Sequence, residues 1–398
     1  MTGRLIIIPD GPAVLAYTLP LLAALRQAGF TVKVAPTAYG GPSAANLVTP
    51  LAWSSLSGHP CIEIDRLDAA ALAWAEAILL APSTPALERV FRNGRGAALL
   101  KEAKRPVLVL DSCLGGQAPD PENAARWLAV LPEGSHFLPA AGQFVPLGAM
   151  GTVVAPETAA AMEAVGRMFT KQDLAQRRVL VSAGPTVEDI DPVRFLSNRS
   201  SGKMGAALAL AAWRRGAQVT LVHGPMSATL PDLPGLERVP VRSAAQMRDG
   251  MAAAWADCDV AIFSAAVADF TPDHYCPEKI KKLDGQSLIL HLVRTTDILG
   301  ELGASARRPA CLVGFAAESD DVEINALAKL RRKHCDILCA NDIRRPDAGF
   351  AVDTNAVTIY TAEGEAIEVP LLPKRQVAER ILDAVVQRLG RAPRSENS

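Results

Sequence analysis

Short apolar runs alternate with longer helix-like stretches along the whole chain of 398 residues, and this alternation is the strongest constraint on the fold. In the first half the apolar runs are LIIIP, TVKVAP, AILLAPS and PVLVLDS. In the second half they are RVLVSAG, QVTLVHG, DVAIFSAA, ACLVGFAA and CDILCAND. Strands that alternate with helical patterns are typical of parallel sheets with crossover helices. The sequence therefore predicts an α/β protein with doubly wound, Rossmann-like sheets.

The alternation is interrupted once, by the helical stretch PETAAAMEAVGRMFTKQDLAQ, which becomes polar toward its end. Near the C-terminus, AVTIYTAEGEAIEVP predicts a β-hairpin, and a helix is expected over about residues 373–389. We therefore expect four segments along the chain. They are a domain of residues 1–165, a linker of residues 166–177, a second domain of residues 178–390 and a disordered tail of residues 391–398.

Charge and composition exclude several classes of protein. The formal net charge is −1 and no long basic run occurs, which argues against nucleic acid or an anionic membrane as a partner. The first apolar run is too short for a signal peptide, and no stretch reaches the roughly 18 apolar residues of a membrane span. The seven cysteines are scattered and form no CxxC motif, which favours reduced thiols over disulfides or a zinc site. These features predict a cytoplasmic protein.

The segment between the strand RVLVSAG and its helix is unusually long. It reads AGPTVEDIDPVRFLSNRSSGKMG, about twenty residues where about two to six are usual. A structural interpretation makes Ser200 or Ser201 the N-cap of the buried helix KMGAALALAAWRRGAQ. A functional interpretation makes the helix N-terminus, Lys203 and the Asn198 amide a site for phosphate and carboxylate groups. This stretch alone leaves both interpretations open.

Further polar residues follow other strands of the second half. They lie in SAAVADF (264–270), PEKIKK (277–282), VGFAAES (313–319) and CANDI (339–343), and Lys329 and Lys333 lie one helical turn apart. Each has a structural alternative, such as a helix cap or a solvated charge run. Parallel strands bind ligands at their carboxyl ends, so together these residues predict a cleft suited to a triphosphate. The absence of GxxxxGK[ST] and GxGxxG excludes a P-loop and an ordinary dinucleotide site.

In this order, these motifs resemble the phosphopantothenate-cysteine ligase half of the bacterial bifunctional coenzyme A biosynthesis proteins, over about residues 178–388. In that family CTP activates the carboxylate of 4'-phosphopantothenate as an acyl-cytidylate and pyrophosphate leaves. The amine of cysteine then displaces CMP and forms the amide. The resemblance implies the same activity here, with CTP as co-substrate and Mg²⁺ as cofactor.

The resemblance also implies roles for individual residues. Asn198 would hold and polarise the acyl-cytidylate, Arg194 would support its loop, and Lys279 would lie on a flap that closes over the phosphates. The nucleotide site would be lined by Ala265, Asp269, Lys279, Thr295, Thr296, Asp297, Ile298, Phe315, Lys329 and Lys333. The substrate-binding residues would be Gly184, Ser200, Ser201, Gly202 and Lys203. Thr295 and Thr296 stand where the family usually has Asn-Pro, and no metal ligand is assigned.

The first half resembles, more weakly, the flavodoxin-like decarboxylase half of the same family, which carries FMN. Its catalytic histidine would fall on Asp68 or Cys61, depending on the alignment, and DSCL (111–114) replaces Pro-Ala-Met-Asn. AAGQFVPLGAMGTV lacks the cysteine expected as proton donor, and we interpret His59 and Cys113 as structural. PDGPA introduces two prolines where the FMN phosphate would sit, so FMN binding is doubtful. We expect a retained scaffold without decarboxylase activity.

Two alternative functions stay open at this point. One is a CTP-dependent amide ligase of a specialised pathway, with a different acid or amine. The other is a non-catalytic regulator that binds CTP or coenzyme A intermediates. The resemblance further implies a homo-oligomer, because the flavin halves of the family assemble as trimers and the ligase halves pair as dimers.

Overall fold

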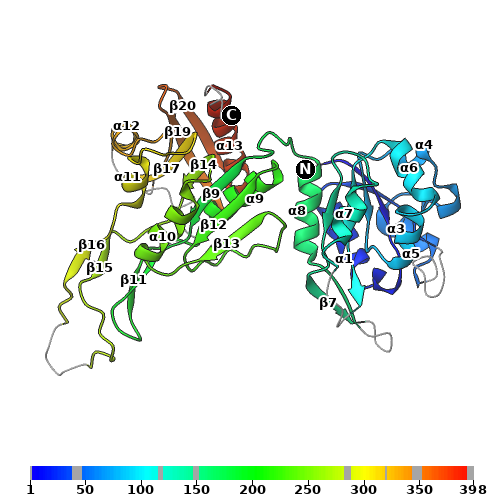
Figure 1. The fold of residues 1–398 in the computed structure, drawn as a ribbon, viewed down its shortest axis with the longest axis horizontal. Helices are drawn as coiled ribbons and strands as arrows, with labels where there is room; N and C mark the ends of the chain where they lie inside the picture. Colours follow the sequence, from blue (N-terminus) through cyan, green and yellow to red (C-terminus); the bar gives the residue numbers. More distant parts are fainter. Residues whose placement is uncertain are drawn as a thin grey trace. The chain divides into compact units, whose positions relative to one another are not determined.

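The computed structural model describes residues 2–37, 47–114, 120–146, 152–281, 288–318, 321–342 and 352–391 (Figure 1). Several predicted features lie outside these residues. They are the tail from residue 392, residues 147–151 of the segment AAGQFVPLGAMGTV, and the final residues of three motifs (Lys282, Ser319 and Ile343). The chain divides into two compact units. Unit 1 comprises residues 1–171 with 231–234, and unit 2 comprises residues 172–230 with 235–398.

The described part of unit 1 forms a five-stranded parallel sheet in the order β2-β1-β3-β4-β6. Its strands are β1 (Arg4–Ile8), β2 (Thr31–Val34), β3 (Ala77–Leu80), β4 (Val107–Leu110) and β6 (His136–Leu138). An antiparallel sheet adds β5 (Cys113–Leu114), β7 (Gly142–Pro146) and β8 (Thr152–Pro156). The strand order is that of flavodoxin-like folds, as expected.

The helices of unit 1 lie between the parallel strands or, in the case of α8, after the last of them. They are η1 (Pro12–Val14), α1 (Thr18–Gln27), α3 (Pro50–Ser57), η2 (Ile64–Arg66), α4 (Ala69–Ala73), α5 (Pro85–Phe91), α6 (Arg95–Ala103), α7 (Asn123–Leu128) and α8 (Thr158–Met168). The sheet is covered on both faces, which explains why β3 and β4 are apolar and buried at every residue. The helical stretch predicted from residue 156 ends at Met168, before its polar part.

The described part of unit 2 forms an eight-stranded sheet in the order β13-β12-β9-β14-β17-β18-β19-β20. The parallel strands are β9 (Arg178–Ala183), β12 (Gln218–His223), β13 (Leu236–Pro240), β14 (Val260–Phe263), β17 (Cys311–Glu318) and β18 (Ile337–Asp342). The antiparallel hairpin of β19 (Thr354–Thr361) and β20 (Ala366–Pro373) completes the sheet and confirms the predicted hairpin. The prediction of doubly wound α/β architecture in both halves is therefore confirmed.

Helices cover both faces of this sheet. They are α9 (Lys203–Arg214), α10 (Ala244–Trp255), α11 (Ile298–Gly303), α12 (Val322–Arg332) and α13 (Lys374–Arg391). One core packs α10, α11 and α12 against the sheet around Met251, Leu302 and Leu330. The antiparallel ribbons β10 (Val187–Asp189) with β11 (Phe195–Ser197), and β15 (Phe270–Pro272) with β16 (Leu292–Arg294), extend from the sheet (Figure 1).

The start of α9 differs from the structural interpretation of its sequence. Its N-cap is Gly202, with φ of 75°, and no side chain caps the helix, so the N-cap that the structural interpretation places at Ser200 or Ser201 is wrong. The glycine is required because a Cβ at this position would lie 2.5 Å from Cβ of Met226, and because a side chain strains this left-handed conformation. The first-turn N–H groups of α9 are therefore not used by a capping side chain.

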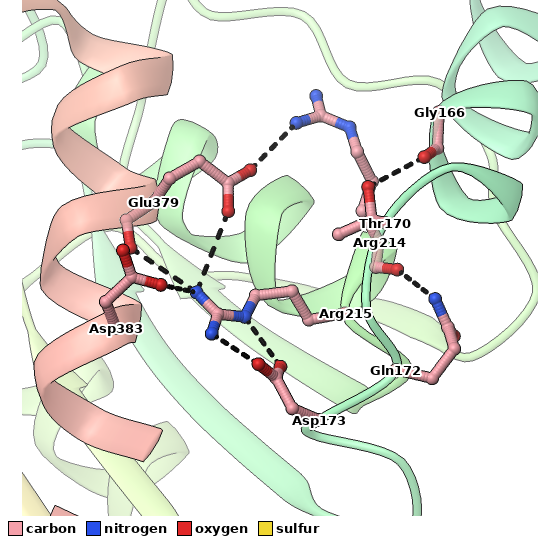
Figure 2. Close-up of polar contacts among 8 residues, drawn as sticks. All are labelled: Gly166, Thr170, Gln172, Asp173, Arg214, Arg215, Glu379 and Asp383. Carbon is pink, nitrogen blue, oxygen red and sulfur yellow. Dashed lines mark hydrogen bonds and ion pairs between the residues drawn. The ribbon is translucent and has the colours of Figure 1, made fainter. Parts of the chain in front are cut away.

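The C-terminal end of α9 is held by ion pairs around a buried arginine, Arg215 (Figure 2). The Arg215 guanidinium is 5% exposed and donates to both carboxylate oxygens of Asp173, at 2.8 and 2.7 Å, and to Asp383 on α13 at 2.8 Å. Gln172 donates to the carbonyl of Arg214 at 2.8 Å. These bonds fasten the first residues of unit 2 and helix α13 to the same point.

Candidate functional site

A cavity of about 720 Å³ opens at the carboxyl ends of β9, β14 and β17 in unit 2. The strand order reverses at β9, since β12 and β13 continue on one side and β14, β17 and β18 on the other. Doubly wound sheets bind ligands at such a switch point. The cavity wall comes from the start of α9, the segment after β14, the segment before α11, β17 and the end of α12.

Most of the residues predicted for the site line this single cavity. They are Asn198, Ser200, Ser201, Gly202, Lys203, Ala265, Asp269, Thr295, Thr296, Asp297, Ile298, Phe315, Lys329 and Lys333. Gly184, Arg194 and Lys279 are not part of its wall. The roles assigned to all these residues stay predictions, while the common location of the first group is a structural observation.

Cationic side chains outnumber carboxylates in the cavity wall. The cationic residues are Lys203, Arg294, Lys329, Arg332, Lys333 and Lys374, and the acidic residues are Asp269 and Asp297. The wall also contains the entrance of α9, whose N-terminal dipole favours negative charge. The cavity therefore suits a ligand with several negative charges.

Helix α9 approaches the sheet closely at Gly205. A Cβ there would lie 2.4 Å from Cβ of Ala183, the last residue of β9. The glycine thus lets the helix entrance reach the edge of the sheet. Lys203, the first residue of the helix, forms an ion pair with Asp353 at 2.6 Å.

The Asn198 side chain is held by the segment that follows β14. Its Nδ2 donates to the carbonyls of Ala266 and Val267, at 3.1 and 3.0 Å. These bonds fix the plane of the amide at the cavity wall. Because both use the amide nitrogen, the Oδ1 atom is the part of the side chain left to accept a hydrogen bond from a substrate.

A second group of charges lies where α11 and α12 meet the cavity. Lys333 forms an ion pair with Asp297, and the Asp297 Oδ1 also accepts from the N–H of Gly300 as the N-cap of α11. Burial lowers the pKa of Lys333, and nearby Asp269 opposes this shift. Thr295, a departure from the family pattern, donates to the carbonyl of Ala268 at 2.6 Å and so supports the loop.

Arg194 belongs to a polar cluster that is separate from the cavity wall and includes Ile280, the neighbour of Lys279. Arg194 donates to Asp191 at 3.0 Å and to the carbonyl of Ile280 at 2.6 Å, while the Ile280 N–H donates to Asp191 at 3.1 Å. Burial opposes the ionisation of Asp191, but N–H groups of Val193, Ile280 and Arg194 and the Arg194 side chain lower its pKa to about 2. Arg194 therefore anchors the segment that carries the exposed Lys279. No role was predicted for Asp191, which lies in the long segment between β9 and α9.

Among the described residues, no group of three or more histidine, cysteine or acidic side chains is arranged to hold a metal ion. Mg²⁺ in nucleotide sites is usually bound by phosphates together with one or two carboxylates. Asp269 and Asp297 are the carboxylates in this cavity wall. The Asp297 oxygens already bind Lys333 and the N–H of Gly300, so Asp269 is the carboxylate that fits such a role with a bound nucleotide. No described helix has both the length and the apolar composition that crossing a membrane requires.

The corresponding strand ends of unit 1 do not fit an FMN phosphate. The Asp10 carboxylate, 2% exposed, lies after β1 and accepts hydrogen bonds from the hydroxyls of Thr37 and Thr84. These threonines follow β2 and β3, so a buried negative charge occupies the edge where a phosphate would need donors. Pro9 and Pro12 contribute no N–H groups there.

The residues considered for decarboxylase chemistry in unit 1 have structural contacts. Asp68 is the N-cap of α4 and accepts from the N–H of Ala71 at 2.7 Å. The His59 ring packs edge-on against Trp74, with ring centroids 6.2 Å apart. Burial, with a smaller contribution from Asp111, raises the pKa of the Cys113 thiol, which makes it a poorer nucleophile.

Comparisons with known proteins show which proteins this chain is similar to. Residues 174–389 match the family described as the DNA/pantothenate metabolism flavoprotein C-terminal domain. The coenzyme A biosynthesis bifunctional protein CoaBC of Bacillus subtilis (strain 168) is 38% identical over 92% of this chain and 92% of its own length. The CoaBC of Escherichia coli (strain K12) is 36% identical over 98% of both chains. A crystal structure of the C-terminal domain of a CoaBC is 39% identical, covers 56% of this chain and 100% of that chain, and has a TM-score of 0.48.

The family match spans more than half of the chain, and both relatives align along nearly the full length of each protein. The chain therefore belongs to the family of bifunctional coenzyme A biosynthesis proteins.

Proposed function

We propose that this chain joins 4'-phosphopantothenate to cysteine in a CTP-dependent reaction, and that the predicted domain of residues 178–390 carries the activity. One observation carries the proposal. A single cavity combines an excess of cationic side chains with the uncapped start of α9 and the fixed amide of Asn198. The relatives are named for coenzyme A biosynthesis. In the ligase family that unit 2 resembles, the substrates are phosphopantothenate and cysteine, so we propose the same two substrates here.

The chemistry has two steps. A carboxylate oxygen of phosphopantothenate attacks the α-phosphorus of CTP, and the bond to the β-phosphate breaks, which gives the acyl-cytidylate and pyrophosphate. The amine nitrogen of cysteine then attacks the acyl carbon. CMP leaves with the oxygen that came from the carboxylate, and the nitrogen loses a proton. A carboxylate resists amine attack until it carries such a leaving group, so the first step makes the second possible.

We assign separate roles in these two steps to individual residues of the cavity. Lys203 and the N–H groups at the start of α9 neutralise phosphate oxygens as two anions approach each other. The amide nitrogen of Asn198 is held by two carbonyls, so in place of polarising the acyl-cytidylate this residue would present Oδ1 to the attacking amine. Arg194 and Asp191 hold the segment that brings Lys279 over the phosphates when it closes. Bound Mg²⁺ would neutralise phosphate charge, with Asp269 as a protein ligand.

We propose that unit 1 no longer supports FMN-dependent decarboxylation. The buried Asp10 would repel an FMN phosphate, and Asp68 and Cys113 have structural surroundings in place of catalytic ones. The unit then acts as a scaffold, and we expect the chain to form at least a dimer through its ligase domain. A separate protein would perform the decarboxylation.

One assay tests the proposal. The protein is incubated with CTP, Mg²⁺, phosphopantothenate and cysteine, and pyrophosphate and CMP are measured. We expect pyrophosphate only when phosphopantothenate is present, and CMP release that depends on cysteine. Pyrophosphate release only with another acid would show a different substrate, and no release with any acid would contradict a ligase. Asn198→Ala is expected to bind CTP but to lose turnover or accumulate the acyl-cytidylate.

A further inference from the structure

Two asparagine side chains meet in the cavity wall, and neither has a role in the function proposed above. Asn341, from the motif CANDI, lies near the end of β18. Strand β19 runs antiparallel to β18, so its first residues lie beside that end, and Asn355 is the second of them. Nδ2 of Asn341 donates to Oδ1 of Asn355 at 3.2 Å.

The orientation of each amide follows from its neighbours, because an amide nitrogen donates hydrogen bonds and an amide oxygen accepts them. Asn355 is 1% exposed, and its Nδ2 lies 3.9 Å from Sδ of Met204 in the first turn of α9. A thioether sulfur can only accept, so it fixes the nitrogen of Asn355 toward Met204 and the oxygen toward Asn341. The nitrogen of Asn341 must then face Asn355, which leaves Oδ1 of Asn341 at the outer end of the pair.

This Oδ1 atom of Asn341 is a buried acceptor without a donor. It is closed off from water, and within the described residues no group donates a hydrogen bond to it. Such an acceptor costs free energy that a donor on a ligand would recover. The torsion that turns an asparagine amide has a broad energy well, so a small rotation brings Oδ1 to a group in the cavity. The wall therefore holds an acceptor suited to an N–H or O–H group.

The chemistry and the place of the pair indicate which ligand supplies that group. The phosphate oxygens of CTP accept hydrogen bonds and cannot satisfy Oδ1. 4'-Phosphopantothenate carries an amide N–H in the chain between its carboxylate and its phosphate. The pair also adjoins the segment predicted to bind this acid, because Met204, which contacts Asn355, follows Lys203 directly.

We propose that Oδ1 of Asn341 accepts a hydrogen bond from the amide N–H of 4'-phosphopantothenate, and that this bond helps the cavity to select its acid substrate. The proposal rests on the ligase function proposed above and names the group by which that acid is distinguished from others. An acid with an ester in place of the amide would present an oxygen lone pair where Oδ1 needs a hydrogen. A site built around a hydrogen bond rejects such an analogue, because its own polar atom is left unpaired.

The ester analogue of 4'-phosphopantothenate, in which oxygen replaces the amide N–H, tests this bond on the full chain. With CTP, Mg²⁺ and cysteine, we expect the wild type to use the amide with a kcat/KM about 10- to 100-fold higher than that for the ester. Asn341→Leu has nearly the same size but no acceptor, and should reduce this preference to less than about 3-fold, mainly by lowering kcat/KM for the amide.

The same variant shows whether the rest of the cavity is intact. For Asn341→Leu, the CTP affinity in calorimetry and the KM for cysteine should change by less than about 2-fold, because neither ligand uses Oδ1. Asn325→Leu is the matched control, since it replaces an exposed asparagine of α12 outside the cavity wall. It should keep the wild-type preference for the amide.

An unchanged preference in Asn341→Leu would overturn the proposal, because other groups would then reject the ester. Weaker CTP binding or a raised KM for cysteine, with the preference unchanged, would overturn it in favour of the cytosine amino group or the amine of cysteine. If Asn341→Leu fails to fold, Asn341→Ala also removes the acceptor and should show the same loss of preference. A wild-type chain that uses both acids equally well would overturn this proposal alone, whereas one that uses neither would refute the proposed function itself.

Discussion

Replacement of Arg215 by methionine tests the account of how unit 2 is held together. The substitution keeps an apolar side chain of similar length but removes the guanidinium, which is 5% exposed and bonded to Asp173 and Asp383 (Figure 2). Loss of one partner of a buried ion pair typically costs about 3–5 kcal/mol. The side chains of Asp173 and Asp383 are 25% and 57% exposed and can regain water, so the lower end applies. We expect the free energy of unfolding to fall by about 3 kcal/mol.

For a unit of this size, a loss of about 3 kcal/mol corresponds to a fall in Tm of about 6–12 °C. Differential scanning calorimetry of the full chain measures this shift. Arg248→Met is the matched control, because Arg248 pairs with Glu301 on the surface, where the two side chains are 43% and 39% exposed. That pair should contribute less than about 1 kcal/mol. A shift for Arg215→Met no larger than that of the control would refute the reasoning.

Three further predictions follow from single contacts. Burial raises the pKa of Asp111 to about 6, so the stability that this shift gives the folded protein is present at pH below about 4 and is lost as pH rises through 6. Asp111→Asn should therefore raise the free energy of unfolding of unit 1 at pH 8 by up to about 3 kcal/mol and have little effect on it at pH 3.5. Urea unfolding at the two pH values measures this difference. Equal effects at both pH values would contradict the prediction. Gly205→Ala should lower the free energy of unfolding by about 1–3 kcal/mol and weaken CTP binding, because the new Cβ would meet Ala183. A variant with the Tm and CTP affinity of the wild type would contradict the close approach of α9 to the sheet. Asp353→Asn should tighten CTP binding a few-fold at low salt by freeing Lys203, and weaker binding in calorimetry would show that Asp353 helps to hold the nucleotide.

The sequence predicts well which residues gather at the carboxyl ends of the strands, because each apolar strand and the polar residues that follow it are close together in the chain. Asp269 lies six residues after the end of β14, and Phe315 lies in the second half of β17, so parallel pairing of the two strands brings both residues to one cavity. Lys329 and Lys333 were predictable for a similar local reason, their spacing of one helical turn.

Other features depend on partners that are distant in the sequence. Gly202 replaces the predicted serine caps because Met226 packs against it, and no local pattern reveals that contact. Lys374 reaches the cavity through the antiparallel register of β19 and β20. The PDGPA turn predicts a loss of donors, but not that Thr37 and Thr84 converge on Asp10.

The fate of the carboxylate oxygen tests the central claim most directly. Phosphopantothenate labelled with ¹⁸O in its carboxylate is converted with CTP, Mg²⁺ and cysteine, and the nucleotide and phosphate products are analysed by mass spectrometry. If the cavity of unit 2 activates the acid as an acyl-cytidylate, one ¹⁸O atom will appear in CMP and none in pyrophosphate. Unlabelled CMP, or label in pyrophosphate or orthophosphate, would contradict the account.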